Sequence, residues 1–379
     1  MRRGPNPLPV HIGMVSALVH RGVLKGIDNP LEASEEDIRA LARVESLKAM
    51  FAGMKRYQAL EIEIPRLSRP VVWREGAVSL QHIARGSSDA KQKEILLLVP
   101  SLINRSYILD LYEGRSFAAW LAQQGRDVYL LDWGDLRDDA DLGTIEHVIT
   151  RRLIPVLEFL RQECGGMPVQ GLGYCMGGTL LLGAAALRPD LLQKMVLLAA
   201  PWDFHAGTGK LLGRVKFWAP SALPAVHQRG YLPGSYLQML FASLDPETTI
   251  SKFEKFSIMV EDSDACRLFV AVEDWLNDEV DLPRDVAQEC IDGWFLRNHP
   301  AHGKWMLDGM VIDPRAVATP SLVVTAQQDR IVEGPCAAIL GNLLPNSQAL
   351  APNCGHIGLM AGRRAKEEVW QPVDAWLKS

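Results

Sequence analysis

The chain has 379 residues, enough to bury a core in one large or two ordinary domains. Its composition is 48% hydrophobic and 22% charged with a mean hydropathy of +0.01, and no apolar run approaches the roughly 20 residues of a membrane helix. The net charge of −5 gives no reason to expect a nucleic-acid partner, and six cysteines without metal-type spacing predict free thiols, no metal site and a cytoplasmic location.

The first 30 residues carry four basic residues and no acid before Asp28. Prolines interrupt this stretch, so we interpret it as a basic partner-binding arm or a disordered terminus rather than a secretory signal. Ser34 followed by three acids then predicts a helix start. Apolar residues at helical spacing make this helix amphipathic, and it is expected to cover a sheet or to mediate a subunit contact. These residues are Ile38, Leu41, Val44, Leu47 and Phe51.

Strand and helix patterns alternate from residue 71 onward. A short strand pair is expected at 71–76 and 78–83. Continuous apolar runs, typical of buried parallel strands, occur at 94–99, 127–132, 169–174 and 194–199. Helical patterns lie between them at 116–124 and 144–162. The alternation predicts a mostly parallel sheet with helices on both faces. The acidic loop after 127–132, with Asp135, Asp138, Asp139 and Asp141, is expected to be solvated surface.

The alternation stops between 202 and 320, where helical patterns occur without a clear strand. Strand character resumes at 321–325 and, weakly, at 347–351, and a helix over 364–377 closes the chain. A helical segment inserted late in a parallel sheet is expected to cap the carboxyl edge, where ligands bind. The predicted organisation is an N-terminal arm and amphipathic helix (1–65), the first part of the core (66–201), a helical cap or lid (202–320) and the second part of the core (321–379).

The turn Gly-Tyr-Cys-Met-Gly at 173–177 connects an apolar strand to a helix rich in small residues. This is the pattern of a nucleophile elbow with cysteine in place of serine. It predicts a strained, left-handed conformation for Cys175, with the thiol at a helix N-terminus that favours thiolate. The alternative is a glycine-rich turn that contains a small buried cysteine.

A nucleophile needs a base, and the base needs an orienting group. In α/β-hydrolases the chain order is nucleophile, acid, histidine. Asp329 follows the strand at 321–325 and His356 follows the strand at 347–351, so both lie where the elbow also opens. The backbone N–H of Met176 is the first expected oxyanion donor, and that of Leu102, with Ile103 second, is the other. A thioester on cysteine keeps an acyl group activated, which suits transfer to an alcohol.

Two segments together resemble the polyhydroxyalkanoate (PHA) synthase family. They are Val99-Pro-Ser-Leu-Ile-Asn-Arg-Ser-Tyr-Ile-Leu-Asp-Leu and Gly173-Tyr-Cys-Met-Gly-Gly-Thr, and the resemblance spans most of 70–379. It implies an α/β-hydrolase fold and an acyltransferase that polymerises 3-hydroxyacyl-CoA with release of CoA and no cofactor. It further implies that Cys175 is acylated and that His356 activates the thiol. By the same resemblance, Asp329 supports the histidine or helps to activate the hydroxyl of the growing chain.

The short stretch before the strand at 94–99 resembles that of synthase subunits that work with a second subunit. The resemblance therefore implies an oligomer with a second synthase subunit, at the surface of polymer granules in the cytoplasm. The loop after Asp329 and the residues before His356 depart from the family pattern, which indicates a divergent branch. Two other readings are a cysteine esterase or thioesterase and a catalytically idle binding relative. Asp132, in an Asp-Trp-Gly turn, is interpreted as a structural hydrogen-bonding residue rather than a catalytic one.

Overall fold

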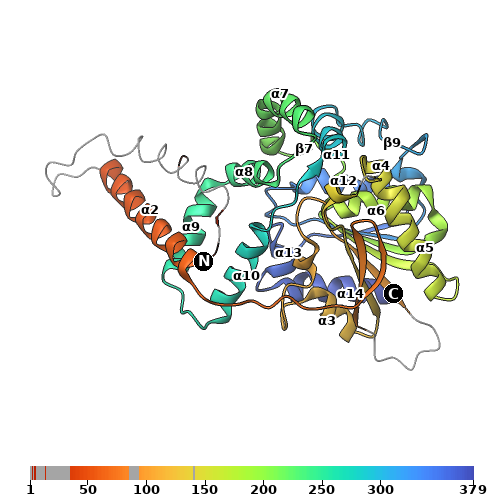
Figure 1. Ribbon diagram of the computed structural model, residues 1–379, viewed down its shortest axis with the longest axis horizontal. Coiled ribbons are helices and arrows are strands. Elements are labelled where there is room, and N and C mark those ends of the chain that lie inside the picture. Colours follow the sequence, from red (N-terminus) through yellow and green to blue (C-terminus); the bar gives the residue numbers. More distant parts are fainter. Residues whose placement is uncertain (1, 3, 6–12, 14–34, 85–93, 140) are drawn as a thin grey trace. The chain divides into compact units, whose positions relative to one another are not determined.

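The computed structural model describes residues 2, 4–5, 13, 35–84, 94–139 and 141–379 (Figure 1). The chain forms two compact units. The larger unit comprises 66–234 and 279–379, and the smaller one comprises 1–65 and 235–278. In the described part of the chain, no helix is both long and apolar enough to cross a bilayer.

An eight-stranded sheet organises the larger unit, in the order β1-β2-β4-β3-β5-β6-β11-β12. Strands β1 and β2 pair antiparallel with each other, and β2 pairs antiparallel with β4. The pairings from β4 to β12 are parallel, which confirms the predicted sheet. The strands are β1 (Val71–Glu75), β2 (Val78–Ala84), β3 (Ile95–Val99), β4 (Asp127–Asp132), β5 (Val169–Tyr174), β6 (Leu192–Leu198), β11 (Ser321–Val324) and β12 (Ser347–Leu350).

Helices cover both faces of this sheet, so its central strands are buried. Figure 1 shows α5 (Ile154–Glu163) and α6 (Met176–Leu187) on one face and α3 (Phe117–Gln123) and α14 (Gln371–Lys378) on the other. Every residue of β3 and β5 is buried, which explains their continuous apolar sequence. Shorter or adjoining helical elements are η2 (Ser106–Leu109), η3 (Leu136–Asp138), α4 (Ile145–Val148), η4 (Ile149–Leu153), η5 (Pro189–Leu191), η7 (Pro314–Ala316), α12 (Gly334–Leu343), α13 (Gly358–Ala361) and η8 (Lys366–Trp370).

The segment expected as one cap, 202–320, is divided between the two units. The larger unit contains α7 (Lys210–Arg229), α11 (Arg284–Gln288) and η6 (Glu289–Leu296). Contrary to the expectation of helices alone, two-residue strands pair as β7 (Tyr231–Leu232) with β8 (Leu282–Pro283) and β9 (Met306–Leu307) with β10 (Met310–Val311). These strands are too short for a sequence pattern to reveal them. Helix α8 (Gly234–Leu244) begins at the unit boundary, and α9 (Pro246–Ser257) and α10 (Asp264–Leu276) belong to the smaller unit.

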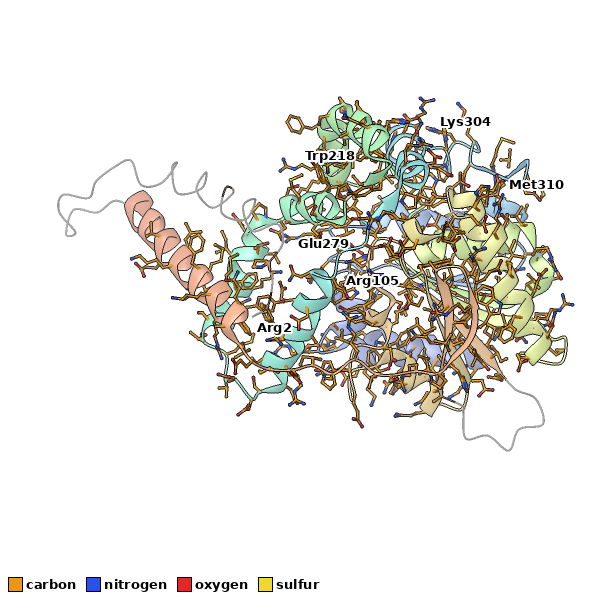
Figure 2. All side chains as sticks on the ribbon, in the orientation of Figure 1. Arg2, Arg105, Trp218, Glu279, Lys304 and Met310 are labelled. Atoms are coloured by element: carbon orange, nitrogen blue, oxygen red, sulfur yellow. The ribbon has the colours of Figure 1, made fainter. Side chains whose placement is uncertain are left out.

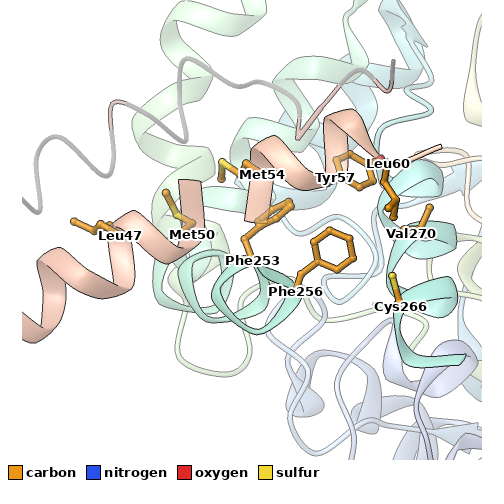
Figure 3. Close-up of a cluster of buried hydrophobic side chains, with 9 residues drawn as sticks. All are labelled: Leu47, Met50, Met54, Tyr57, Leu60, Phe253, Phe256, Cys266 and Val270. Carbon is orange, nitrogen blue, oxygen red and sulfur yellow. The ribbon is translucent and has the colours of Figure 1, made fainter. Parts of the chain in front are cut away.

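Helix α2 (Glu35–Ala59) packs on α9 and α10 in the smaller unit (Figure 3). Leu47 is buried as expected, but Phe51 is 40% exposed, so the predicted apolar face is wrong at that position. The buried face turns instead through Met50, Met54 and Tyr57, because Phe253 and Phe256 of α9 lie against it. The predicted cap residue Ser34 and most of the basic arm lie outside the described residues.

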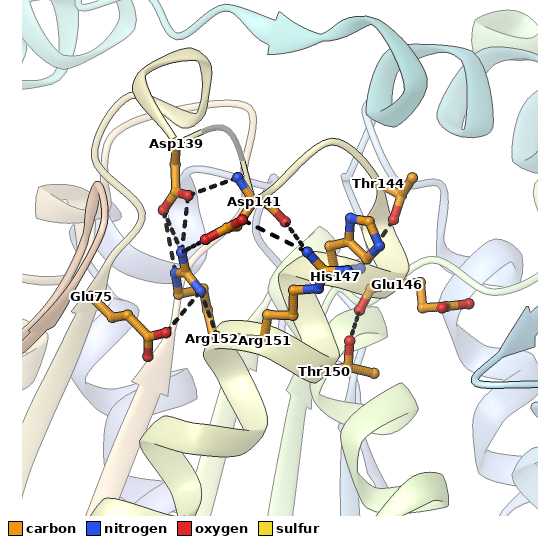
Figure 4. Close-up of polar contacts among 9 residues, drawn as sticks. All are labelled: Glu75, Asp139, Asp141, Thr144, Glu146, His147, Thr150, Arg151 and Arg152. Carbon is orange, nitrogen blue, oxygen red and sulfur yellow. Dashed lines mark hydrogen bonds and ion pairs between the residues drawn. The ribbon is translucent and has the colours of Figure 1, made fainter.

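The acidic loop after β4 is not simply solvated surface, so that prediction is wrong for Asp139. Both oxygens of its buried carboxylate accept from Nη2 of the buried Arg152 at 2.9 Å (Figure 4). Arg152 also pairs with Glu75 at 3.2 Å, and Asp139 accepts from the N–H of Ala77 at 3.1 Å. The run of acidic residues in the sequence does not show that Arg152, 13 residues further along the chain, pairs with Asp139 in the folded protein. The pair ties the β1–β2 hairpin to the helix at η4.

Candidate active site

The predicted elbow is present between β5 and α6. Cys175 has φ 55° and ψ −129°, a conformation that a residue with a side chain rarely adopts. The backbones approach closely on either side of the turn. A Cβ on Gly177 would lie 2.2 Å from the Val99 carbonyl oxygen, and one on Gly173 would lie 2.3 Å from the Gly178 Cα. Only glycine fits at these two positions, so the turn holds the thiol rigidly at the carboxyl end of the sheet.

The structure brings Cys175, Asp329 and His356 together, and all three are buried. Nδ1 of His356 lies 2.6 Å from Oδ2 of Asp329, and the His356 ring interacts electrostatically with the Cys175 thiol. The other oxygen of Asp329 accepts from the N–H groups of Ile331 and Val332, each at 2.8 Å. The carboxylate is therefore fixed by the backbone on one side and orients the imidazole on the other.

Charge governs the protonation of His356. Burial by itself lowers the pKa of His356, but the charges of Asp329 and Cys175 and their hydrogen bonds raise this pKa well above 6.5. The imidazolium form of His356 is therefore favoured near neutral pH. Burial raises the pKa values of the partly buried thiols of Cys336 and Cys354 to about 12 and about 11. They stay protonated under the same conditions and are poor nucleophiles.

Tyr174, the last residue of β5, is a neighbour that the sequence did not single out. Its hydroxyl donates to the main-chain carbonyl of His356 at 3.2 Å, and the two ring centroids lie 5.1 Å apart. The histidine is thus held through its backbone as well as through its ring. The position of Tyr174 directly before the nucleophile is the one signal in the sequence that could have identified it.

The candidate oxyanion donors lie at the elbow and in the loop that follows β3. Met176 is the first residue of α6, and such N–H groups have no partner within their own helix. In the loop, the N–H of Ile103 donates to Oγ of Ser101 at 3.2 Å. The N–H of Leu102 has no hydrogen-bond partner among the described residues. Of the two candidates in this loop, the Ile103 N–H is engaged, and Leu102 as the second oxyanion donor stays a prediction.

Asp132 makes hydrogen bonds of a structural kind. Oδ1 accepts from the N–H of Gly134 at 3.2 Å, and Oδ2 accepts from Nε2 of Gln81 at 3.4 Å. Both bonds hold the turn after β4, in agreement with the structural interpretation.

A cysteine at an elbow, followed by an aspartate and a histidine beyond later strands of a parallel sheet, defines an α/β-hydrolase. The family model for the alpha/beta hydrolase fold matches residues 94–362. A solved structure from Sulfolobus solfataricus is 13% identical, with a TM-score of 0.52 over 83% of this chain and 97% of that one. At this identity the likeness concerns the fold alone.

Among known proteins, the chain is similar to two that are each named poly(3-hydroxyalkanoate) polymerase subunit PhaC. The one from Allochromatium vinosum is 32% identical over 286 residues, which cover 74% of this chain and 80% of the relative. The one from Haloferax mediterranei is 30% identical over 322 residues, which cover 83% of this chain. This chain spans 65% of the length of the Haloferax protein. The chain belongs to the family of PhaC-type poly(3-hydroxyalkanoate) polymerase subunits within the α/β-hydrolase superfamily.

Proposed function

We propose that the protein is an acyltransferase that polymerises 3-hydroxyacyl-CoA into polyhydroxyalkanoate and releases CoA, through a covalent thioester on Cys175. The observation that carries the proposal is the buried His356, which is hydrogen-bonded to Asp329 and interacts electrostatically with the buried Cys175. The names of the two relatives support the polymerase activity.

In the first half-reaction the Cys175 thiolate attacks the thioester carbonyl of 3-hydroxyacyl-CoA. The N–H groups of Met176 and Leu102 stabilise the oxyanion that forms. The carbon–sulfur bond to CoA then breaks, and the leaving thiolate takes a proton from the imidazolium of His356. The products are free CoA and an acyl group on Cys175.

In the second half-reaction the hydroxyl of a growing polyester chain attacks this acyl group, and His356 takes the hydroxyl proton. The ester forms, and the Cys175 thiolate is restored beside the imidazolium. Both oxygens of Asp329 are engaged, one by His356 and one by two backbone N–H groups. This favours a supporting role for Asp329 over direct activation of the hydroxyl.

The proposal extends to the surroundings of the reaction. We expect the protein to act in the cytoplasm as an oligomer with a second synthase subunit, at the surface of polymer granules. The naming of both relatives as subunits supports a partner. We also retain the assignment of 202–320 as a cap that limits the access of water to the acyl-enzyme.

The test is incubation with 3-hydroxybutyryl-CoA, alone and with the product of any neighbouring gene that resembles a second synthase subunit, while free CoA and insoluble polymer are both followed. The expected result is CoA release with polymer formation, both abolished by Cys175→Ala. Cys336→Ala serves as the control, because burial keeps that thiol protonated. CoA release without polymer would show a thioesterase instead. Undiminished release by Cys175→Ala would refute the mechanism.

A further inference from the structure

The Asp-Trp-Gly turn at 132–134 contacts the loop that is proposed to bind the oxyanion. Trp133 is 4% exposed, and its Nε1 donates to the main-chain carbonyl of Pro100 at 3.0 Å. Pro100 is the first residue after β3, two positions before Leu102. The indole thus reaches from the end of β4 to the start of the loop on the neighbouring strand.

A second hydrogen bond joins the same two loops, with its donor in the loop after β3 and its acceptor in the turn after β4. Nη1 of Arg105, labelled in Figure 2, donates to the carbonyl of Gly134 at 2.8 Å. Gly134 is itself fixed, because its N–H is bonded to Asp132 and a Cβ there would lie 2.3 Å from the carbonyl oxygen of Ala77. The turn after β4 is therefore a rigid support, and the loop after β3 is joined to it at both ends.

These bonds determine how the peptide groups of the oxyanion loop are oriented. A peptide group is planar, so a fixed Pro100 carbonyl also fixes the N–H of Ser101. The Ser101 hydroxyl oxygen then accepts a hydrogen bond from the N–H of Ile103. Leu102 lies between these two fixed groups, and its N–H has no hydrogen-bond partner in the part of the chain that the structure describes.

The nucleophile elbow also contacts the Pro100 carbonyl. A Cβ on Gly177 would lie 2.5 Å from the Pro100 carbonyl oxygen, so this oxygen lies directly against the first turn of α6. A rotation of the Pro100 peptide would therefore alter the distance between the two oxyanion donors, Leu102 and Met176. The Trp133 indole prevents this rotation, because its N–H needs the carbonyl as a buried partner.

We propose that Trp133 is a positioning residue, which holds the Leu102 N–H at the distance from Met176 that a tetrahedral oxyanion requires. This inference rests on the proposed acyl transfer through Cys175. It assigns to the Asp-Trp-Gly turn the task of supporting the oxyanion loop, with Trp133 bonded to the loop and Asp132 and Gly134 holding the turn.

The test compares Trp133→Phe, which removes the indole N–H, with Trp305→Phe. Trp305 is equally well buried and donates its Nε1 to Glu289 at 3.0 Å, a partner outside both loops. Loss of an oxyanion donor costs about 10²–10³ in rate, so its displacement should lower kcat by roughly 10- to 100-fold. KM for 3-hydroxybutyryl-CoA should stay within about threefold of wild type, and Trp305→Phe should leave kcat within about threefold.

Two further measurements separate positioning from general damage and from failure of the proposed function. Alkylation of Cys175 by iodoacetamide forms no oxyanion, so its rate should be the same in Trp133→Phe and wild type. Acylation of Cys175 by p-nitrophenyl butyrate does form an oxyanion, and its rate is measured with the rate of Cys175→Ala subtracted. In Trp133→Phe this acylation rate should fall by the same factor as kcat. This acylation tests the oxyanion loop even if the wild type polymerises nothing.

An acylation rate in Trp133→Phe equal to that in Trp305→Phe would overturn the proposal. So would an alkylation rate that falls as far as the acylation rate. Should Trp133→Phe fail to fold, Arg105→Met removes the other bond between the loops. It should slow acylation in the same direction without slowing alkylation, and an unchanged acylation rate there would also overturn the proposal.

Discussion

Replacement of Asp329 by asparagine should test the geometry of the triad most directly. One oxygen of Asp329 accepts two backbone N–H groups at 2.8 Å, so the asparagine must keep its carbonyl oxygen there. Its NH₂ group then faces Nδ1 of His356, 2.6 Å away in the wild type. The histidine has to accept at Nδ1 and carry its proton on the other nitrogen. In that tautomer it can no longer take a proton from Cys175.

The magnitude follows from the charge that is lost. Two unit charges about 4 Å apart interact by about 4 kcal/mol at an effective dielectric constant of about 20, which corresponds to roughly 10³ in rate. The wrong tautomer costs about 10⁴ in kcat in a serine triad. We therefore expect kcat to fall by about 10³–10⁴ in Asp329→Asn, with the protein still folded.

The pH dependence of kcat/KM for CoA release gives a second, signed measurement. The charge of Asp329 helps to raise the pKa of His356, which keeps the imidazolium available to protonate the leaving CoA. Without that charge, burial is less opposed and the His356 pKa falls. The basic limb of the pH profile should accordingly move to lower pH in the variant.

Asp374→Asn is the matched control, because Asp374 is as buried as Asp329 and is paired with the buried Arg126 instead of a histidine. It should lose stability but keep kcat within about threefold of wild type. The reasoning is refuted if folded Asp329→Asn retains kcat within about tenfold of wild type. A basic limb that stays in place would contradict the role assigned to its charge.

Three further predictions concern stability. Gly177→Ala should lower the unfolding free energy by about 3 kcal/mol or more, because its Cβ would meet backbone oxygens at 2.2 and 2.5 Å. Gly341→Ala is the control, because Gly341 lies in the helix α12 and a Cβ there would have nothing within 4 Å, so this variant should have a higher Tm than wild type. Equal Tm values for Gly177→Ala and Gly341→Ala would contradict the steric argument. Burial raises the pKa of Glu289 to about 7, so between about pH 4.5 and 7 the folded wild type binds more protons than the unfolded chain. The unfolding free energy of wild type, measured by urea titration, should therefore fall by roughly 3 kcal/mol relative to that of Glu289→Gln as the pH rises over this range. If the unfolding free energies of the two proteins change in parallel with pH, this prediction is wrong. Arg152→Met leaves the buried carboxylate of Asp139 without its partner and should lower the unfolding free energy by about 3–5 kcal/mol. Arg151→Met, at a half-exposed position, should lower it by less than about 1 kcal/mol. Similar losses of unfolding free energy in the two variants would show that burial of the ion pair is unimportant.

Much of the fold and the candidate site could be predicted from local patterns. Apolar runs bounded by turn residues predict β3, β4, β5 and β6, since a strand buried on both faces needs apolar residues throughout. Cys175 was evident from the glycines that its turn requires. Asp329 and His356 were found because parallel strands end at one edge, so residues that follow different strands meet there.

Patterns failed where a residue's surroundings come from distant parts of the chain. Phe51 has helical spacing but is exposed and does not belong to the buried cluster around the aromatic residues of α9, which lie about 200 positions further along the sequence. The structure also divides 202–320 between two compact units, and such a division depends on contacts between distant segments and not on composition.

By itself, the sequence determined the parallel sheet, the elbow and the order of Cys175, Asp329 and His356. These depend on residue type and on spacing along a strand or turn, which are local quantities. Only the tertiary structure decided that Asp139 is buried against Arg152, that Ile103 is bonded to Ser101, and that the Trp133 indole holds the Pro100 carbonyl. A hydrogen bond or ion pair depends on distances of a few ångströms between atoms, and a side chain of fixed type can meet many partners until the chain has folded.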